Sequence, residues 1–231
     1  MTKFHNLAET LVPKLAAVTD DEMAILRFAY EAPQSVVLVT LVEVRGGAAR
    51  AVGAQMSVRE DGLFCGYISG GCTEGAVAAE ALATLGQGSD RFLKLGEGSP
   101  FFDIVLPCGG GLTLSLHVLK DRRAVGEVIQ RVEARQIAAL AYDPKLQRLS
   151  ASTLERTSWD GELFHRAYRP RHRLALGGTG IEAETTRQVA QAAGYDVVPI
   201  DSGNLDEDTS VVILLHDLDR ELPLLETALS T

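Results

Sequence analysis

A seven-residue loop, Ile68-Ser69-Gly70-Gly71-Cys72-Thr73-Glu74, places a hydroxyl, a thiol and a carboxyl around two adjacent glycines. Glycine tolerates positive φ and lets a ligand approach the backbone closely. A helical pattern begins at Thr73, so free backbone amides and the positive end of the helix dipole would face whatever lies over the loop. A thiol in that position favours its thiolate form. The loop therefore suits an anionic ligand that accepts a soft sulfur donor.

Two side chains of this loop have more than one interpretation. Ser69 would add a hydroxyl to the ligand cradle, and Glu74 would either cap backbone amides or hold a cationic group. An ordinary strand-to-helix turn explains the same residues, and Cys72 would then be a small buried apolar side chain. The sequence pattern leaves both interpretations open.

A second glycine-rich loop, Pro107-Cys108-Gly109-Gly110-Gly111, repeats a cysteine beside glycines. Alone it is typical of a tight turn, and that alternative stands beside a binding role. If the fold brings Cys108 near Cys72, the two loops would line one pocket. Their spacing in the sequence does not decide whether they meet.

A third pattern, Gly178-x-Gly180-x-x-Ala183, follows a predicted strand and opens a predicted helix. Asp201 ends the next predicted strand, 23 residues after Gly178. Dinucleotide-binding units use such glycines to admit a pyrophosphate and such an acid to bind a ribose. The remaining chain supplies only about half of a doubly wound sheet, which favours a turn kept for packing over a site for NAD(P).

Composition narrows the classes of function. The chain has 231 residues, of which 46% are hydrophobic, and its formal net charge is −9. Such an acidic chain repels nucleic acid and anionic membrane surfaces. Its apolar stretches are far shorter than the roughly 20 residues of a membrane helix, and we expect a cytoplasmic protein. Three cysteines, an odd number, argue against a disulfide framework, and their spacing fits no common zinc pattern.

The elements that would position these loops form two domains, with a boundary after residue 168. Residues 1–168 are expected to form a mixed α/β domain that carries both cysteine loops. Its periodicity predicts helices and strands, and it predicts an irregular segment over 152–170. The expected helices are 7–18, 21–32, 73–85 and 124–134, and the expected strands are 35–44, 54–59, 92–95, 101–106, 112–119, 137–142 and 146–150.

Residues 169–231 are predicted to form a short Rossmann-like βαβ domain, so the fold class is α/β. Strands are expected at 173–176, 197–200 and 210–215, with helices at 182–193 and 219–229. So short a sheet leaves an open edge that a second subunit could cover. This edge is the physical motive for expecting a homodimer.

The motifs taken together resemble the XdhC/CoxI family of xanthine dehydrogenase accessory proteins. The most specific part is Gly66-Tyr67-Ile68-Ser69-Gly70-Gly71-Cys72-Thr73-Glu74. It is preceded by Gly46 to Met56 and followed by Pro107-Cys108-Gly109-Gly110, Gly178-Thr179-Gly180 and His216-Asp217. The sequence departs from the family pattern at Gly47-Ala48-Ala49, where the family has Ser-x-Pro, and at Gln55, where it has arginine.

This resemblance implies a chaperone that binds the molybdenum cofactor and delivers it to a xanthine dehydrogenase-type or carbon monoxide dehydrogenase-type molybdoenzyme. It implies a dimer and no catalytic residue. Arg50 would pair with the cofactor's phosphate, and Cys72 would contact molybdenum. Further cofactor contacts would come from Ser69, Gly70, Gly71, Glu74, Cys108, Gly109 and Gly110.

Two other classes of function remain as alternatives. An NAD(P)-binding oxidoreductase would use Gly178, Gly180 and Asp201. An interaction module would dock on the client enzyme without holding any cofactor.

Overall fold

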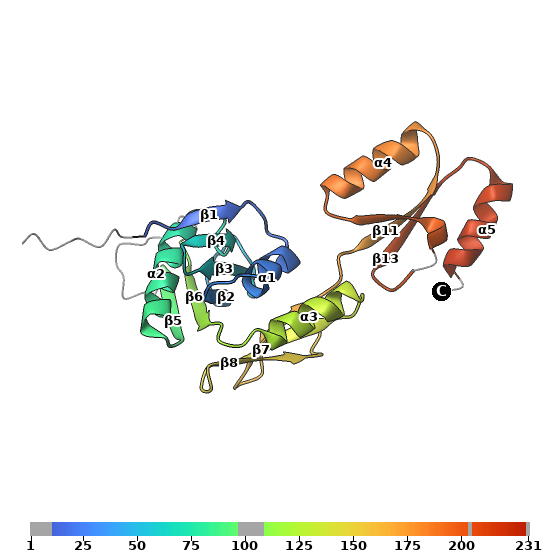
Figure 1. The fold of residues 1–231 in the computed structure, drawn as a ribbon. Helices are drawn as coiled ribbons and strands as arrows, with labels where there is room; N and C mark the ends of the chain where they lie inside the picture. Colours follow the sequence, from blue (N-terminus) through green and yellow to red (C-terminus); the bar gives the residue numbers. More distant parts are fainter. Residues whose placement is uncertain (1–10, 97–108, 203–204, 230–231) are drawn as a thin grey trace, which may run out of the picture. The chain divides into compact units, whose positions relative to one another are not determined.

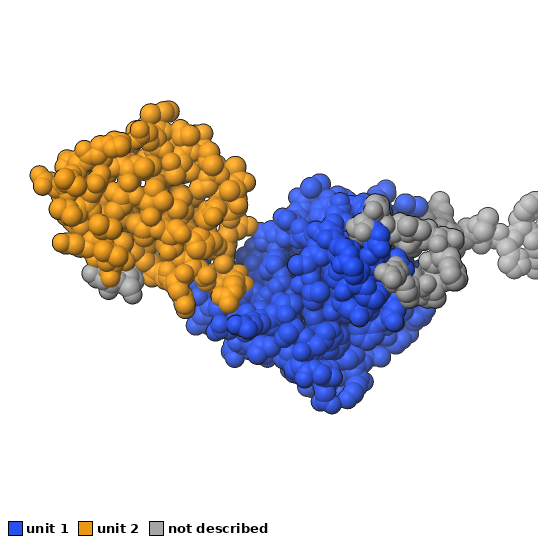
Figure 2. Space-filling model, turned by 180° about the vertical axis from the view of Figure 1, so that it is seen from behind, with its two compact units in different colours: residues 1–168 blue, residues 169–231 orange. Residues whose placement is uncertain are grey.

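The computed structural model describes residues 11–96, 109–202 and 205–229. The chain divides into two compact units, Met1–Tyr168 and Arg169–Thr231, which Figure 2 shows in different colours. Sheets and helices occur in both units, so the α/β fold class is confirmed. That each unit folds as an independent domain stays a prediction.

The first unit is built on a six-stranded sheet with the order β1-β4-β3-β2-β6-β5. Only β1 and β4 pair in parallel, and the other neighbours are antiparallel. The central strand β2 is buried on both faces over most of its length, which explains why Val and Leu dominate its sequence. The strands are β1 (Lys14–Ala17), β2 (Val36–Arg45), β3 (Gln55–Arg59), β4 (Leu63–Gly66), β5 (Arg91–Gly96) and β6 (Gly111–Val118).

One face of this sheet is covered by α2 (Glu74–Gln87), which Figure 1 shows beside β5 and β6. Val77, Ala78 and Ala81 of α2 belong to the same buried cluster as Val37 and Val39 of β2. The loop that precedes α2 starts directly after β4. A packed strand and a packed helix therefore hold both ends of the Ile68–Glu74 loop.

The opposite face of β2 packs on α1 (Glu22–Tyr30) and α3 (Arg123–Glu133). Asp21 caps α1, because its Oδ1 accepts the backbone N–H of Met23 at 2.9 Å. A second, antiparallel sheet with the order β8-β7-β10-β9 packs on α3 and contributes Leu140 and Tyr168 to the same cluster. Its strands are β7 (Ala138–Asp143), β8 (Arg148–Ser152), β9 (Ser158–Trp159) and β10 (Phe164–Tyr168).

Two predictions for the first unit are wrong. The helix expected over 7–18 is replaced at its end by β1, because Pro13 interrupts the pattern and the N–H of Lys14 bonds to the carbonyl of Gly62 at 2.9 Å. The segment 152–170, expected to be irregular, contains β9 and β10. The strand β10 was missed because it contains the polar residues His165 and Arg166, which are typical of loops. In the structure their side chains bond to partners inside the unit. The strand expected over 101–106 lies outside the described residues.

The second unit is a three-stranded parallel sheet with the order β12-β11-β13. This arrangement confirms the short Rossmann-like βαβ prediction. Among the described residues of the chain, no helix is long and apolar enough to cross a membrane. The elements are β11 (Arg173–Gly178), α4 (Ile181–Ala192), β12 (Asp196–Pro199), a short 3-10 helix (Ile200–Ser202), β13 (Thr209–Leu214) and α5 (Leu218–Leu229).

Candidate functional site

The carboxylate of Glu74 lies inside the glycine loop and organises it. Its Oε1 accepts the backbone N–H groups of Ile68 at 3.0 Å and Ser69 at 2.8 Å. Its Oε2 accepts the N–H of Thr73 at 3.1 Å and the hydroxyl of Ser69 at 2.8 Å. Glu74 is only 3% exposed. In this structure the carboxylate holds backbone amides, which was one of its two expected roles.

Electrostatics keep this buried carboxylate ionised. Burial alone would raise the pKa of Glu74, because a charge in an apolar interior is poorly solvated. The hydrogen bonds from Ser69, from the backbone N–H of Glu74 itself and from Ile68 act in the opposite direction and outweigh burial, so the pKa lies below its ordinary value. The loop is thus folded around a negative charge.

Cys72 presents its thiol at the surface of this loop. It is exposed, and its Sγ lies 3.5 Å from the Oγ of Ser69. The alternative that Cys72 is a small buried apolar side chain is therefore wrong. Cys65 is the buried thiol, and burial raises its pKa to about 11. Of these two cysteines, only Cys72 can meet a ligand without rearrangement.

The two glycines give the loop its path. Gly70 and Gly71 have φ of +89° and +111°, and both are exposed. Side chains other than hydrogen are strained in this region of φ. The glycines therefore leave the backbone between Ser69 and Cys72 open to a ligand.

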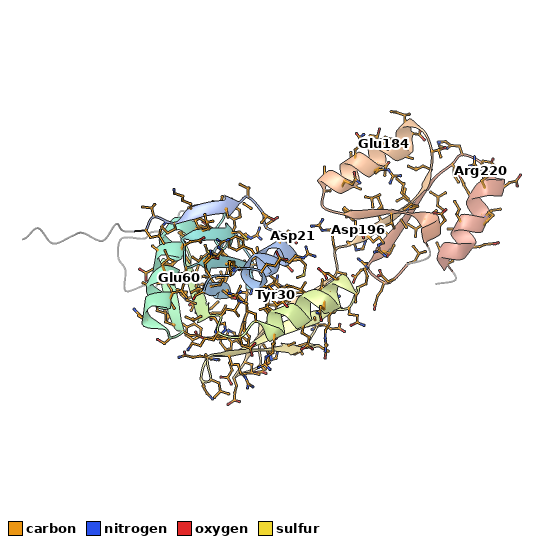
Figure 3. The ribbon with its side chains drawn as sticks, in the orientation of Figure 1. Asp21, Tyr30, Glu60, Glu184, Asp196 and Arg220 are labelled. Atoms are coloured by element: carbon orange, nitrogen blue, oxygen red, sulfur yellow. The ribbon has the colours of Figure 1, made fainter. Side chains whose placement is uncertain are left out.

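A depression of about 310 Å³ opens beside the loop. Its lining brings Arg50, which is 20 residues away in the sequence, together with Gly70 and Tyr67. Arg50 Nη1 lies 3.2 Å from Asp20 Oδ2, in an ion pair whose acid is 71% exposed. Asp20 directly precedes Asp21, which Figure 3 labels at the start of α1. The complete lining is Val18, Thr19, Asp20, Arg50, Tyr67 and Gly70.

Comparisons with known proteins identify the family of the chain. Residues 29–96, which include Arg50 and the whole glycine loop, match the XdhC and CoxI family. The chain is 51% identical over 226 residues to the molybdenum cofactor insertion chaperone PaoD of Escherichia coli K12, covering 94% of this chain and 71% of that protein. The chain belongs to the XdhC and CoxI family. The family prediction is confirmed.

A solved structure supports the fold of this family member. The structure is described as a xanthine dehydrogenase from Bacillus halodurans, and it superimposes with a TM-score of 0.71. The match covers 89% of this chain and 77% of the other, at 17% sequence identity. At this identity the likeness concerns the fold alone.

The second glycine loop of this XdhC and CoxI family member is only partly described. Cys108 lies outside the described residues, so its distance from Cys72 stays undetermined. Gly110 packs on the segment that leads to Arg50, because a Cβ on it would lie 2.1 Å from the carbonyl oxygen of Gly47. Gly109 has φ of +71°. The cofactor contacts expected of Cys108, Gly109 and Gly110 stay predictions.

The predicted nucleotide residues lie together within the second unit. Gly178 ends β11, Gly180 follows that strand, and Asp201 follows β12, so all three lie at the carboxyl edge where such sheets bind ligands. A Cβ on Gly178 would lie 2.4 Å from the carbonyl oxygen of Leu214, so packing alone requires this glycine. Glu182, in the first turn of α4, bonds to His216 at 2.7 Å and puts negative charge where a pyrophosphate would lie. NAD(P) binding stays a prediction.

Some residues near the site carry no signal in the sequence. Asp20 and Arg166 belong to no chemical motif, and their importance depends on contacts between distant segments. Gln55 stands where the family has arginine, and it does not line the depression. Its side chain is buried and bonds to Thr40 and Tyr168.

Proposed function

We propose that this protein binds the molybdenum cofactor and inserts it into a molybdoenzyme client, acting as a chaperone and not as a catalyst. Its 51% identical relative is named a molybdenum cofactor insertion chaperone. One observation carries the proposal: Arg50 and Gly70 line one open depression, and the exposed thiol of Cys72 lies two residues beyond Gly70.

The residues present fit the chemistry of this ligand. A volume of about 310 Å³ lies at the small end of the roughly 300–1,000 Å³ typical of small-molecule pockets. Arg50 offers planar N–H donors that suit the cofactor's phosphate. Cys72 offers a soft sulfur ligand that suits a thiolate-binding metal. When bound, the cofactor supplies the molybdenum chemistry of the client, and this chain's residues only bind, orient and protect it.

Asp20 competes with the ligand for Arg50. Its carboxylate is 71% exposed and holds the guanidinium at 3.2 Å, so an incoming phosphate must replace it. An exposed pair of this kind contributes about 0–1 kcal/mol, and exchange of Asp20 for a doubly charged phosphate is therefore favourable. Arg50 is thus paired with Asp20 before the ligand binds, and it stays accessible to the ligand.

We predict opposite effects from the two members of this ion pair. Arg50→Ala should weaken binding of the molybdenum cofactor about 10- to 100-fold, the loss expected for one charge-assisted hydrogen bond. Asp20→Asn should strengthen binding by a few-fold, because it removes the competing negative charge. The dissociation constant, measured by equilibrium dialysis with pterin fluorescence, checks both.

A matched ion pair on α3 provides the control. Arg131 and Glu127 are similarly exposed and lie 2.7 Å apart, and neither lines the depression. Arg131→Ala and Glu127→Gln should leave the dissociation constant unchanged. If Arg50→Ala binds the cofactor as tightly as the parent protein, the assignment of Arg50 to the phosphate is wrong.

We further propose a xanthine dehydrogenase-type client, a cytoplasmic location and a homodimer. Support for the dimer comes from exposed leucines spaced along α5, since a helix that is apolar on more than one side tends to be covered in an assembly. Light scattering at micromolar concentration should give twice the monomer mass, and a strict monomer would contradict this proposal. These leucines are Leu218, Leu222, Leu225 and Leu229, which are 45–79% exposed.

A further inference from the structure

Arg166 connects the second sheet of the first unit to the loop before β3 and to the start of α1. It belongs to β10 of the second sheet, and its side chain is only 13% exposed. Its Nε donates to the carbonyl oxygen of Gly53 at 2.6 Å. The same guanidinium bonds to the carboxylate of Glu22 and lies over the ring of Tyr168, 4.8 Å from its centre. One side chain thus holds two segments that are distant in the sequence.

These two partners flank the two members of the exposed ion pair. Gly53 follows Arg50 by three residues, and Glu22 follows Asp20 by two. Arg50 and Asp20 come from two different parts of the chain that both line the depression. The separation between Arg166's partners therefore sets the separation between these two parts.

Short hydrogen-bonded segments connect each partner of Arg166 to a residue that lines the depression. The N–H of Gly53 bonds to the carbonyl oxygen of Leu41 at 2.7 Å. The N–H of Ala54 bonds to the carbonyl oxygen of Ala51 at 3.1 Å. The N–H of Asp21 bonds to the hydroxyl of Thr19 at 3.0 Å. Such bonds leave few backbone torsions free between Arg166's contacts and the ligand-facing residues.

The backbone at Gly53 is shaped around this arginine. Gly53 has φ of +96°, and a Cβ there would lie 2.8 Å from the Cδ and 2.9 Å from the Nε of Arg166. The same Cβ would lie 2.9 Å from the Cγ2 of Thr157. A glycine is required here both for its φ and because Arg166 packs directly on its Cα. A side chain at position 53 would therefore displace Arg166.

We propose that Arg166 is a positioning residue for cofactor binding: by holding Gly53 and Glu22 together it fixes the width of the depression and the reach of Arg50. This inference rests on the proposed function. The exposed Arg50–Asp20 pair opens when an anion enters, whereas Arg166, whose side chain is 13% exposed, keeps its contacts. The site then keeps its shape while its own ion pair is exchanged for the ligand.

Three variants and one control test the role of Arg166. Arg166→Met removes every polar contact but keeps much of the apolar stem, and Gly53→Ala displaces the guanidinium from the other side. Arg166→Lys keeps the charge but cannot donate to two partners in a fixed geometry. The control is Arg122→Met, because Arg122 also donates to backbone carbonyls, those of Ala32 and Gln34, and does not line the depression.

Two measurements are made on the full chain: the dissociation constant of the molybdenum cofactor, and amide hydrogen exchange over residues 46–54 without cofactor. Arg166→Met and Gly53→Ala should weaken binding on the order of tenfold or more, the usual loss on removing a supporting contact. They should also speed exchange over 46–54. Arg166→Lys should give intermediate values for both. Arg122→Met should leave both unchanged even where its melting temperature falls equally.

Each other result has a distinct meaning. If exchange over 46–54 speeds up but affinity is kept, Arg166 stabilises the fold without positioning the site, and the inference is wrong. Equal loss of affinity in Arg122→Met at matched stability would also overturn it. If the parent protein itself binds no molybdenum cofactor, the proposed function fails, and the inference that depends on it falls for that separate reason.

Discussion

Replacing Glu74 with alanine should lower the free energy of unfolding of the first unit by about 3–5 kcal/mol, the cost of breaking a buried charged network. The change leaves the N–H groups of Ile68, Ser69 and Thr73 without their acceptor in a region that is buried. Glu74→Gln should lower the free energy of unfolding by less, because its amide oxygen can still accept hydrogen bonds. Some loss remains, because the amide nitrogen then faces other donors. Urea denaturation at neutral pH measures both losses.

The same carboxylate predicts how stability changes with pH. The pKa of Glu74 is lowered in the folded protein from its ordinary value of 4.5, so the folded state favours the ionised form. Its stabilising contribution is therefore complete above the unfolded pKa and is lost as the pH falls from about 4.5 through the lower folded value. Glu74→Gln should remove this part of the acid dependence and leave the rest of the profile intact.

An exposed carboxylate on α3 separates this effect from a general change of charge. Glu127 pairs only with Arg131 among the ion pairs of the described residues, and its side chain is 49% exposed. Glu127→Gln should change the free energy of unfolding by less than about 0.5 kcal/mol. Equal stability of Glu74→Ala and Glu127→Gln would mean that the loop does not depend on its buried carboxylate.

Sequence reasoning located the loop but could not decide what Glu74 does there. Capping of amides and binding of a cation use the same residue type at the same spacing. The choice depends on whether the carboxylate points into the turn, where it is 3% exposed, or out of it. Burial of this kind is set by how β4 and α2 pack on the sheet, which local periodicity does not encode.

Errors in the fold prediction have a related cause. The helix α1 was predictable because a helical period determines which of its side chains are buried, and the strand β2 because its apolar run is buried on both faces. The strand β10 was missed because two of its polar side chains face partners from other segments: His165 bonds to Asp160, and Arg166 bonds to Gly53. Polar residues inside a packed unit look like loop residues when their partners are unknown.

Arg50 could be singled out from the sequence as a candidate, whereas Asp20 could not. Arg50 occupies a family motif, so resemblance alone pointed to it as a phosphate contact. Asp20 lies in the turn before α1 and has no motif, yet it is the residue that Arg50 meets in the folded chain. Charge competition at the site is a property of the tertiary structure.

Replacing Cys72 with alanine should reduce retention of the molybdenum cofactor on the order of 100-fold, the upper end of losses seen when a contact that supports a metal is removed. The reason is that Cys72 is an exposed thiol on an open glycine loop, where its sulfur can serve as a soft ligand to the metal of the cofactor. Cys72→Ser keeps the shape but supplies a harder oxygen donor, so it should lose most of the same affinity. Molybdenum content of the purified variants, together with pterin fluorescence, gives the measurement.

The buried cysteine is the matched control for this prediction. Cys65 is buried with its pKa raised to about 11, so at neutral pH it is neither a nucleophile nor a metal ligand. In Cys108→Ala protein, iodoacetamide should therefore modify Cys72 in the native state and reach Cys65 only after unfolding. Cys65→Ala should keep the cofactor, and alkylation of Cys72 should release it. If alkylated protein retained the cofactor as well as untreated protein, the thiol would not be a contact, and binding would have to depend on Arg50 and the backbone of the loop.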